Sequence, residues 1–455
     1  MNSTKFSKLS LSNDMLLNLE KIGYAQMTPI QSEALPFILD GKDVIAQAKT
    51  GSGKTAAFGI GLLSKLEVKK FRVQSLILCP TRELADQVAK ELRILAKFAH
   101  NIKILTLCGG AAFGPQLGSL RHGAHIVVGT PGRILKHLDK ETLNLENLNM
   151  LILDEADRML DMGFIEEIQK VIAYAPKERQ TLLFSATYPD EIQSMSKTLQ
   201  NNAISVKTES IEVVNKITER FYEVEGDKLQ SMVNIFSTFN PSNVIVFCNT
   251  KVETDEVAKR LQKMNIDALA LHGDMEQYDR NDVLVQFSNS SARVLVATDV
   301  AARGLDIKEL AMVVNYDLPH GEETYTHRIG RTGRAGAEGL ACTLYTHFED
   351  EKIAEYRDEK RLFEDVTTLK VQNNFEMRPK NVTLVIEGGK KDKLRAGDIL
   401  GALTGDAGLK GSSIGKIDIY DRQAYVAIDR AFIDEAQKRL SKGKIKSKKF
   451  SVWIL

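Results

Sequence analysis

Several features are scarce or missing in this sequence of 455 residues, and each absence excludes a class of protein. Cysteine occurs four times, and the four positions are scattered with no C-x-x-C pair. This spacing argues against a zinc site and against a disulfide framework. Because each cysteine lies in or just after an apolar strand-like run, we expect reduced thiols in the core. The four residues are Cys79, Cys108, Cys248 and Cys342.

Long hydrophobic runs are also missing. No apolar stretch approaches the ~18 residues of a membrane-spanning helix, and the first residues lack the apolar segment of a signal peptide. The hydrophobic content of 43% is ordinary for a globular protein. We therefore expect a soluble, cytoplasmic protein, and its length predicts two or three domains.

Net charge is nearly absent, but the balance is uneven along the chain. Residues 378–455 hold 17 lysines and arginines against 9 aspartates and glutamates, a net charge of +8, which leaves −7 for residues 1–377. A basic segment on an acidic body suggests a separate module that binds a polyanion. A charge run of this kind can also be ordinary solvated surface.

What the sequence does contain is a glycine-rich stretch, residues 48–55, between an extended apolar run and an apolar helical run. A strand, a glycine-rich turn and a helix N-terminus together form a cradle of backbone N–H groups that favours anions. In such a cradle Lys54 would reach the β- and γ-phosphates of a nucleoside triphosphate, and the Thr55 hydroxyl would ligate Mg²⁺. Ala48 stands where the usual pattern has glycine, and a chance glycine-rich turn is the alternative. The residues expected to line the cradle are Ala48, Lys49, Thr50, Gly51, Ser52, Gly53, Lys54 and Thr55.

Apolar strand-like runs alternate with helical stretches through the first half of the chain. Continuous apolar strands between helices predict a parallel sheet covered on both faces, with ligands bound at the carboxyl ends of the strands. The expected strands are Asp43–Ala46, Ser75–Cys79, Lys103–Leu107, His125–Val128, Met150–Leu153, Gln180–Phe184 and Ile204–Val206.

An acidic pair follows the apolar strand that ends at Leu153. Asp154 in this position would hold Mg²⁺, and Glu155 would orient or deprotonate the attacking water. The alternative is an acidic helix N-terminus, which the helix dipole also favours.

Small, hydroxylated and basic residues follow three other predicted strands. Hydroxyls, backbone N–H groups and guanidinium forks grip phosphates without reading bases, so these strand ends predict a track for a nucleic-acid backbone. Each short motif alone is more often a turn. The predicted track residues are Pro80, Thr81, Arg82, Gly110, Thr130, Pro131, Gly132 and Arg133. Ser185 and Thr187, after another strand, are either a tight strand end or a link between the nucleotide and this track.

A second alternating array follows a polar linker and lacks a glycine-rich phosphate loop. Its expected strands are 243–247, 268–271, 293–297, 312–315 and 340–344. Arg331 and Arg334 are three residues apart and can face one way. A guanidinium supplied from outside stabilises the charge that spreads during γ-phosphate cleavage, although a solvated basic helix has the same pattern.

The basic tail has the predicted order strand, helix, strand, strand, helix, strand over about seventy-five residues. This order suggests a sheet like that of an RNA-recognition motif. Alignment to that motif puts Ala424 and Val426 at the base-stacking positions and turns Tyr425 inward, so the aromatic platform is expected to be missing. Binding would then depend on phosphate contacts by basic residues, namely Lys390, Lys391, Lys393, Arg395 and the cluster from Lys442 to Lys449.

Taken together, these motifs resemble the successive motifs of the DEAD-box RNA helicases. Upstream, Gly23, Tyr24 and Thr28–Gln31 resemble the family's Q motif, with Met27 where proline is usual and Phe6 at the usual aromatic position. The resemblance implies two tandem RecA-like α/β domains, ATP with Mg²⁺, and recognition of adenine by Gln31. The implied domain ranges are 1–206, a linker 207–217, 218–365, a linker 366–380, and an RRM-like domain 381–455.

The resemblance also implies roles in the second domain. Arg331 and Arg334 would complete the ATP site across the cleft, with Gly304 and Asp306 helping to close it. Asp299 and His327 would couple γ-phosphate sensing to RNA. The further implied RNA contacts are Asn249, Thr250, Gln277, Arg280, Thr298 and Arg303. Closure would bend one RNA strand and separate a duplex locally.

The tail is similar to that of the DbpA-like branch of this family, most specifically in residues 388–405 and 414–417. Such proteins hold a hairpin of 23S ribosomal RNA, and the resemblance implies remodelling of that RNA during assembly of the large ribosomal subunit. Two other interpretations remain open: an RNA clamp that uses ATP only as a latch, and a DNA helicase.

A substitution in the phosphate loop tests the nucleotide assignment. Lys54→Ala removes the ammonium group expected at the β- and γ-phosphates, so we expect ATP turnover to be abolished. The measurement is steady-state ATPase activity with RNA present. Near-normal rates in the variant would contradict the phosphate role of Lys54.

Overall fold

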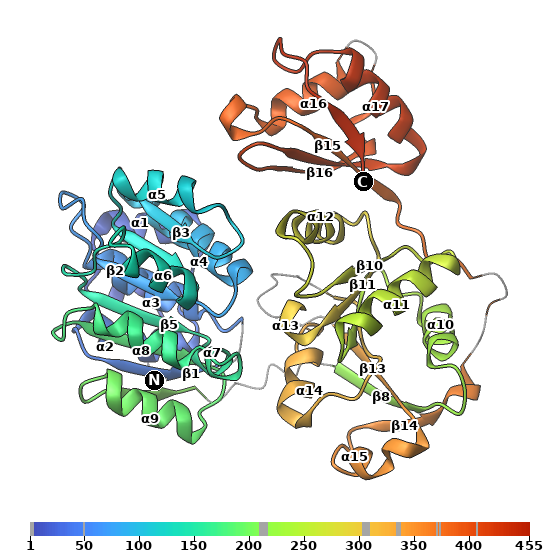
Figure 1. Ribbon diagram of the computed structural model, residues 1–455, viewed down its shortest axis with the longest axis horizontal. Coiled ribbons are helices and arrows are strands. Elements are labelled where there is room, and N and C mark those ends of the chain that lie inside the picture. The colour runs from blue at the N-terminus through green and yellow to red at the C-terminus, as the bar shows by residue number, and fades with distance from the viewer. Residues whose placement is uncertain are drawn as a thin grey trace. The chain divides into compact units, whose positions relative to one another are not determined.

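Figure 1 shows the protein as a computed structural model of the whole chain. The structure describes residues 4–48, 51–208, 217–302, 310–333, 338–369, 372, 375–405 and 408–455. The chain divides into two compact units near residue 213. We describe each unit by itself.

The first unit is built on a seven-stranded sheet in which every neighbouring pair of strands is parallel. Its strand order is β3-β4-β2-β5-β6-β1-β7. The strands are β1 (Val44–Gln47), β2 (Ser75–Leu78), β3 (Ile104–Leu107), β4 (Ile126–Gly129), β5 (Met150–Asp154), β6 (Gln180–Ser185) and β7 (Ile204–Lys207). All seven match strands expected from the sequence.

Helices cover both faces of this sheet, which explains why its central strands are apolar along their whole length. Alternate residues of one strand enter different cores: Leu151 packs with helices α6 to α8, whereas Ile152 packs with helices α2 to α4. The helices are α1 (Asn13–Lys21), α2 (Pro29–Leu39), α3 (Lys54–Ser64), α4 (Arg82–Leu95), α5 (Phe113–Arg121), α6 (Pro131–Asp139), α7 (Ala156–Asp161), α8 (Ile165–Ala173) and α9 (Asp190–Leu199).

The second unit begins with another parallel sheet of seven strands, in the order β10-β11-β9-β12-β13-β8-β14. The strands are β8 (Ile217–Glu223), β9 (Val244–Cys248), β10 (Ala268–Leu271), β11 (Val294–Thr298), β12 (Met312–Asn315), β13 (Gly339–Tyr345) and β14 (Leu362–Asp365). Its helices are α10 (Lys228–Phe239), α11 (Lys251–Lys263), α12 (Gln277–Ser288), α13 (Asp299–Ala302), α14 (Gly321–Ile329) and α15 (Asp350–Ala354).

Two of these strands, β8 and β14, do not appear in the sequence analysis. They pair with each other at one edge of the sheet, and β14 is the edge strand. Edge strands are partly exposed, so their sequences alternate with polar residues and lack the continuous apolar run that identifies a central strand. Arg220 and Glu364, one on each strand, form an ion pair of 2.5 Å across this edge.

The C-terminal part of the second unit is a four-stranded antiparallel sheet in the order β16-β17-β15-β18. Its elements are β15 (Asn381–Ile386), α16 (Ala396–Thr404), β16 (Ile414–Ile419), β17 (Ala424–Asp429), α17 (Ile433–Lys442) and β18 (Val452–Ile454). The predicted order of strands and helices is confirmed, and both helices pack on one face of the sheet.

Two expectations from composition can be compared with this fold. In the part of the chain that the structure describes, no helix has the length and apolar character that crossing a membrane requires. All four cysteines are buried with free thiols, as expected.

The contact between α2 and α3 gives a test of the packing. A methyl group added at Gly61 of α3 would lie 2.2 Å from Cγ2 of Ile38 on α2, so Gly61→Ala should destabilise the first unit by about 1–3 kcal/mol. Gly118 in α5 has no atom within 4 Å of such a methyl group, so Gly118→Ala is the matched control and should be neutral or stabilising. Thermal unfolding of both variants measures the difference, and equal midpoints would contradict the packing.

Candidate functional site

The glycine-rich loop lies between β1 and α3, where the sequence analysis expected a cradle for phosphate. Gly51 and Gly53 have φ angles of +85° and +91°, a conformation that side chains with a Cβ rarely adopt. Helix α3 begins at Lys54, so its first backbone N–H groups face the loop. Lys54 is buried, and its Nζ donates a hydrogen bond to the Ala48 carbonyl at 2.8 Å. A buried ammonium group beside the N-terminus of a helix is suited to a polyphosphate.

Gln31 ties the Q-motif segment to this loop. Its Nε2 donates to the Gly53 carbonyl at 3.1 Å, and its Oε1 accepts from the Thr28 backbone N–H at 2.9 Å. Phe6 and Tyr24 lie edge to face with ring centroids 6.3 Å apart. Burial, and then the neighbouring Glu91 carboxylate, raises the pKa of Tyr24 to about 12. The predicted adenine-side residue therefore contacts the loop directly, with an aromatic pair in the same segment.

Asp154 ends β5 as a buried carboxylate. Burial raises its pKa to about 7; the Lys54 charge opposes this rise and the Glu155 charge adds to it. Its Oδ1 is enclosed and has no hydrogen-bond partner among the described residues. A buried oxygen without a partner costs free energy unless a ligand satisfies it, so this atom fits a hard cation such as Mg²⁺.

Glu155 follows in a left-handed conformation, with φ 53° and ψ 53°. Its Oε2 accepts a 2.6 Å hydrogen bond from Nη1 of Arg158, and both side chains are almost fully buried. The sequence analysis did not identify Arg158. The signal was available, because residues three apart on a helix are neighbours and α7 begins between the two.

Asp157 is a second residue that the sequence analysis left without a role. Its Oδ2 accepts hydrogen bonds from the backbone N–H of Ala186 at 3.0 Å and from that of Thr187 at 2.8 Å. Its own backbone N–H donates to the Ser185 hydroxyl at 3.3 Å. Burial alone would raise the pKa of Asp157, but the bonds from Thr187 and the Lys54 and Arg158 charges lower it. The acidic motif after β5 is thus bonded directly to the polar segment after β6.

The predicted nucleic-acid track in the first unit lies at helix N-termini. Thr81 caps α4, accepting from the Leu84 backbone N–H at 3.2 Å. Arg82 lies so close to the glycine turn after β3 that a methyl group on Gly110 would overlap its guanidinium. Arg133 donates to the Ala111 carbonyl at 2.9 Å. Both arginines therefore hold the turn after β3, and Thr130, Pro131 and Gly132 begin α6 beside it.

Phe113 adds an aromatic feature next to this track that the sequence analysis missed. Its ring stacks on His137 with centroids 4.2 Å apart, and burial, then the Arg133 and Lys136 charges, lowers the pKa of His137 to about 4. Arg133, Lys136 and Lys140 lie 5.7–5.9 Å from the Phe113 centroid. The lysines were visible in the sequence, but Phe113 and α6 meet only in the fold.

Arg328 forms hydrogen bonds to residues at two strand ends of the second unit. The sequence analysis assigned it no role. It is fully buried on α14 and donates two hydrogen bonds of 2.7 Å to Asp299 and one of 2.8 Å to Oδ1 of Asn249. Its guanidinium lies 5.1 Å from the Phe247 centroid. A bidentate pair of this kind fixes both partners in one geometry. Two predicted site residues, Asn249 and Asp299, are thereby held together.

The other predicted residues of the second unit lie on the same strand ends and helices. Thr250 caps α11, Thr298 ends β11, and Gln277 and Arg280 lie on α12. His327 lies in the last turn of α14. Arg331 lies just after the end of this helix and is buried. The predicted residues Lys49, Thr50, Arg303, Gly304, Asp306 and Arg334 lie outside the described part of the chain.

The basic residues of the C-terminal domain come from two segments that meet. Lys390 and Lys391 form a short 3₁₀ turn, η6 (Lys390–Asp392), and Lys393 follows it. Lys446, from the distant cluster, donates to the Lys393 carbonyl at 3.0 Å and lies 3.7 Å from the Asp398 carboxylate. Arg395 caps α16 through its backbone. The fold therefore joins the two basic segments into one surface.

One expectation about this domain is wrong. Ala424 and Val426 are in the core under the two helices, not at exposed stacking positions. Tyr425 points to the opposite face of the sheet, and it is buried there against Val285 of α12 and Val385. Its hydroxyl donates to Asp282 at 2.8 Å. Tyr425 is buried because α12 packs on this face of the sheet. The sequence of the strand alone does not show this contact.

Polar contacts extend this seam between α12 and the sheet. Asn289 donates to the Thr383 hydroxyl at 2.9 Å, and Arg430 pairs with Asp267 at 3.0 Å. Burial, and then the bond to Asp282, raises the pKa of Tyr425. The sheet face that an RNA-recognition motif usually presents to bases is therefore covered by a helix of the same unit.

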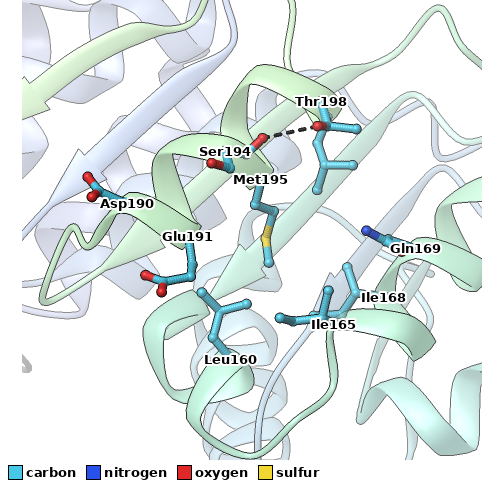
Figure 2. A pocket seen from close by; sticks show the side chains of 10 residues that line it. Leu160, Ile165, Ile168, Gln169, Asp190, Glu191, Ser194, Met195 and Thr198 are labelled. Atoms are coloured by element: carbon cyan, nitrogen blue, oxygen red, sulfur yellow. Dashed lines mark hydrogen bonds between the residues drawn. The ribbon is translucent and has the colours of Figure 1, made fainter.

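Figure 2 shows a separate groove of about 440 Å³ in the first unit. Its floor is apolar, with Asp190 and Glu191 together on one helix and Gln169 on another. The lining residues are Leu160, Ile165, Ile168, Gln169, Asp190, Glu191, Ser194, Met195, Thr198 and Leu199. None of them is a predicted site residue, so the groove is distinct from the predicted site.

Comparison with protein families assigns all three parts of the chain. The DEAD/DEAH box helicase model matches residues 28–195, the helicase conserved C-terminal domain matches residues 227–336, and the DbpA RNA binding domain matches residues 383–454.

Individual relatives extend over nearly the whole chain. The ATP-dependent RNA helicase DbpA of Escherichia coli strain K12 is 50% identical over 464 aligned positions, 99% of this chain and 100% of the relative. The protein of that name from Bacillus subtilis strain 168 is 38% identical and covers 93% of both chains. Among solved structures, S. cerevisiae Dbp5 bound to RNA and ADP BeF3 has a TM-score of 0.71 at 29% identity, covering 80% of this chain and 96% of that one.

The buried pair of Glu155 and Arg158 gives a test of the site's electrostatics. Arg158→Met leaves a buried carboxylate without its partner, which should destabilise the first unit by about 3 kcal/mol. Adding Glu155→Gln removes the stranded charge and should restore most of the loss. Calorimetry of the full chain measures both, with the first-unit transition identified by its response to ATP. A double variant as unstable as Arg158→Met alone would contradict the pairing.

Proposed function

The chain belongs to the DbpA family of DEAD-box ATP-dependent RNA helicases, and from this premise we propose its RNA target and the roles of its residues. We propose that it remodels 23S ribosomal RNA in cytoplasmic precursors of the large ribosomal subunit. The observation that carries this proposal is the RNA-binding domain at residues 383–454, which the E. coli relative shares within its full-length match. The joined basic surface of that domain supports it as an anchor on RNA.

ATP binds at the loop of the first unit in this proposal. Gln31, bonded to the loop at Gly53, reads the adenine edge, with Phe6 and Tyr24 beside it. Lys54 exchanges its bond to the Ala48 carbonyl for the β- and γ-phosphates. The remaining loop contacts come from the backbone of residues 49–53.

Two residues would hold Mg²⁺ with the nucleotide, namely Thr55 and Asp154, whose buried Oδ1 lacks a partner among the described residues. When bound, Mg²⁺ supplies positive charge that stabilises the phosphoryl group during its transfer. Glu155 orients or deprotonates the attacking water. For this role its carboxylate must either break the ion pair with Arg158 or contact the water while the pair remains.

RNA is gripped by two strips of strand-end residues that become one bent track when the units close. Closure is driven by Arg331 and Arg334 of the second unit, which stabilise charge on the γ-phosphate, with Gly304 and Asp306 completing the contact. A duplex cannot follow the bend, so one strand is released locally. After hydrolysis the units separate and RNA leaves.

Coupling between the nucleotide and the track runs through bonded pairs in each unit. In the first unit Asp157 bonds to Ser185 and Thr187, so a change at the acidic motif shifts the segment after β6. In the second unit Arg328 joins Asp299 to Asn249, and His327 precedes it on α14.

A fragment of large-subunit ribosomal RNA tests the target. We expect it to stimulate ATP turnover at lower concentration than an unrelated RNA of equal length. Lys390→Ala with Lys391→Ala and Lys393→Ala should remove this preference while unselective stimulation remains. The lysine variant is preferred to removal of residues 381–455, because that removal would also expose the apolar side chain of Val285 on α12.

A matched control replaces three exposed lysines elsewhere, Lys177, Lys197 and Lys352, with alanine, and should keep the preference. If the ribosomal fragment still stimulates the Lys390, Lys391 and Lys393 variant preferentially, the proposed anchor is wrong.

A further inference from the structure

Two tyrosines at the seam between α12 and the C-terminal sheet are exposed, in contrast to the buried Tyr425 beside them. Tyr278 on α12 is 48% exposed and Tyr420, just after β16, is 42% exposed, whereas Tyr425 is 3% exposed. Large aromatic rings that remain in solvent next to a well-packed seam are not needed to fill that seam.

One glutamine fixes the geometry of this cluster. Nε2 of Gln423 donates to the Tyr278 hydroxyl at 2.7 Å, and Oε1 of Gln423 lies 3.0 Å from the Tyr425 hydroxyl, whose single proton is donated to Asp282. The Tyr420 ring lies edge to face with Tyr425, with centroids 5.5 Å apart. Tyr278 is therefore held by Gln423, and Tyr420 packs on the buried Tyr425, so that both rings are kept in place at little cost in conformational freedom.

The neighbours of the two tyrosines are residues that the proposed function assigns to RNA. Tyr278 is adjacent in sequence to Gln277 and on the same helix as Arg280. The Tyr420 carbonyl accepts a 2.8 Å hydrogen bond from the backbone N–H of Lys390, so this ring is attached to the basic turn. The cluster thus connects the helix that carries track residues to the surface that carries the anchor.

We propose that Tyr278 and Tyr420 form a stacking platform for unpaired bases of RNA, located between the track and the anchor. This inference rests on the proposed function and adds a contact that neither strip of backbone-gripping residues supplies. Aromatic faces accept any base, so the platform binds single strands without reading sequence. In this proposal the two tyrosines stack bases in place of the sheet face, which α12 covers.

The charges around the cluster indicate what kind of contact it makes. Glu276 and Asp279 expose carboxylates on the same helix, and Asp421 lies 3.9 Å from Lys391. These acids offset the local arginine and lysine charges. The platform therefore contributes through stacking, and its contribution is nearly independent of salt, unlike that of the lysines.

The test separates the ring from the hydroxyl. Tyr278→Ala and Tyr420→Ala in the full chain should each weaken binding of a labelled single-stranded oligoadenylate of about 15 nucleotides by about tenfold, with an ATP analogue present. The slope of log Kd against log salt concentration should not change. Tyr278→Phe loses the bond to Gln423 but keeps the ring, so it should bind like the wild type.

Tyr174 provides the matched control. It is also 48% exposed, and its hydroxyl bonds to Asp139 in the first unit, so Tyr174→Ala should leave RNA binding unchanged. If Tyr278→Phe lost as much affinity as Tyr278→Ala, the role of Tyr278 would be its hydrogen bond between α12 and the C-terminal sheet, and the inference would be wrong. Unchanged affinity in both alanine variants would also overturn it. A wild-type chain that binds RNA without RNA-stimulated ATP turnover would overturn the proposed function but not this inference.

Discussion

The interaction on which the first unit depends is the burial of opposite charges at the carboxyl ends of its parallel strands. Lys54, Asp154 and Glu155 are buried, with exposed fractions of 6%, 3% and 4%, so water does little to stabilise their charges. Two of them have partners within the protein, the Ala48 carbonyl and Arg158, whereas one oxygen of Asp154 has none among the described residues. A site built this way is prepared for a ligand that brings both phosphate and a cation.

In both units a buried charged side chain connects the ends of different strands. One buried charged residue, Asp157 in the first unit and Arg328 in the second, bonds to segments that follow different strands. Because charge-assisted bonds are strong and geometrically specific, each of these two residues holds two strand ends in a fixed arrangement. In the C-terminal domain the sheet face opposite the two helices packs on α12, and we therefore propose that RNA contacts come from the loops and edges of the domain.

The sequence predicted the central strands, the glycine-rich turn between β1 and α3, and the order of elements in the tail, because these depend on local pattern. Residues such as Arg158 and Arg328 were missed because their partners are set by the fold, not by a motif. Strand β14, at the edge of the second sheet, and its neighbour β8 were missed because partial exposure interrupts their apolar pattern. Tyr425 is buried as expected, but on the face of the sheet opposite the two helices, because it packs on α12, where its partner Asp282 is 143 residues away.

We propose that Asp154 is kept buried, with one oxygen unpaired, for the cation that accompanies ATP. The most direct test of this proposal is the affinity of the full chain for ATP with Mg²⁺ and with the metal chelated, compared with Asp154→Asn. We expect Mg²⁺ to tighten ATP binding to the wild type, and we expect the variant to lose most of this dependence while still binding ATP. An equal Mg²⁺ dependence in the wild type and the variant would contradict it.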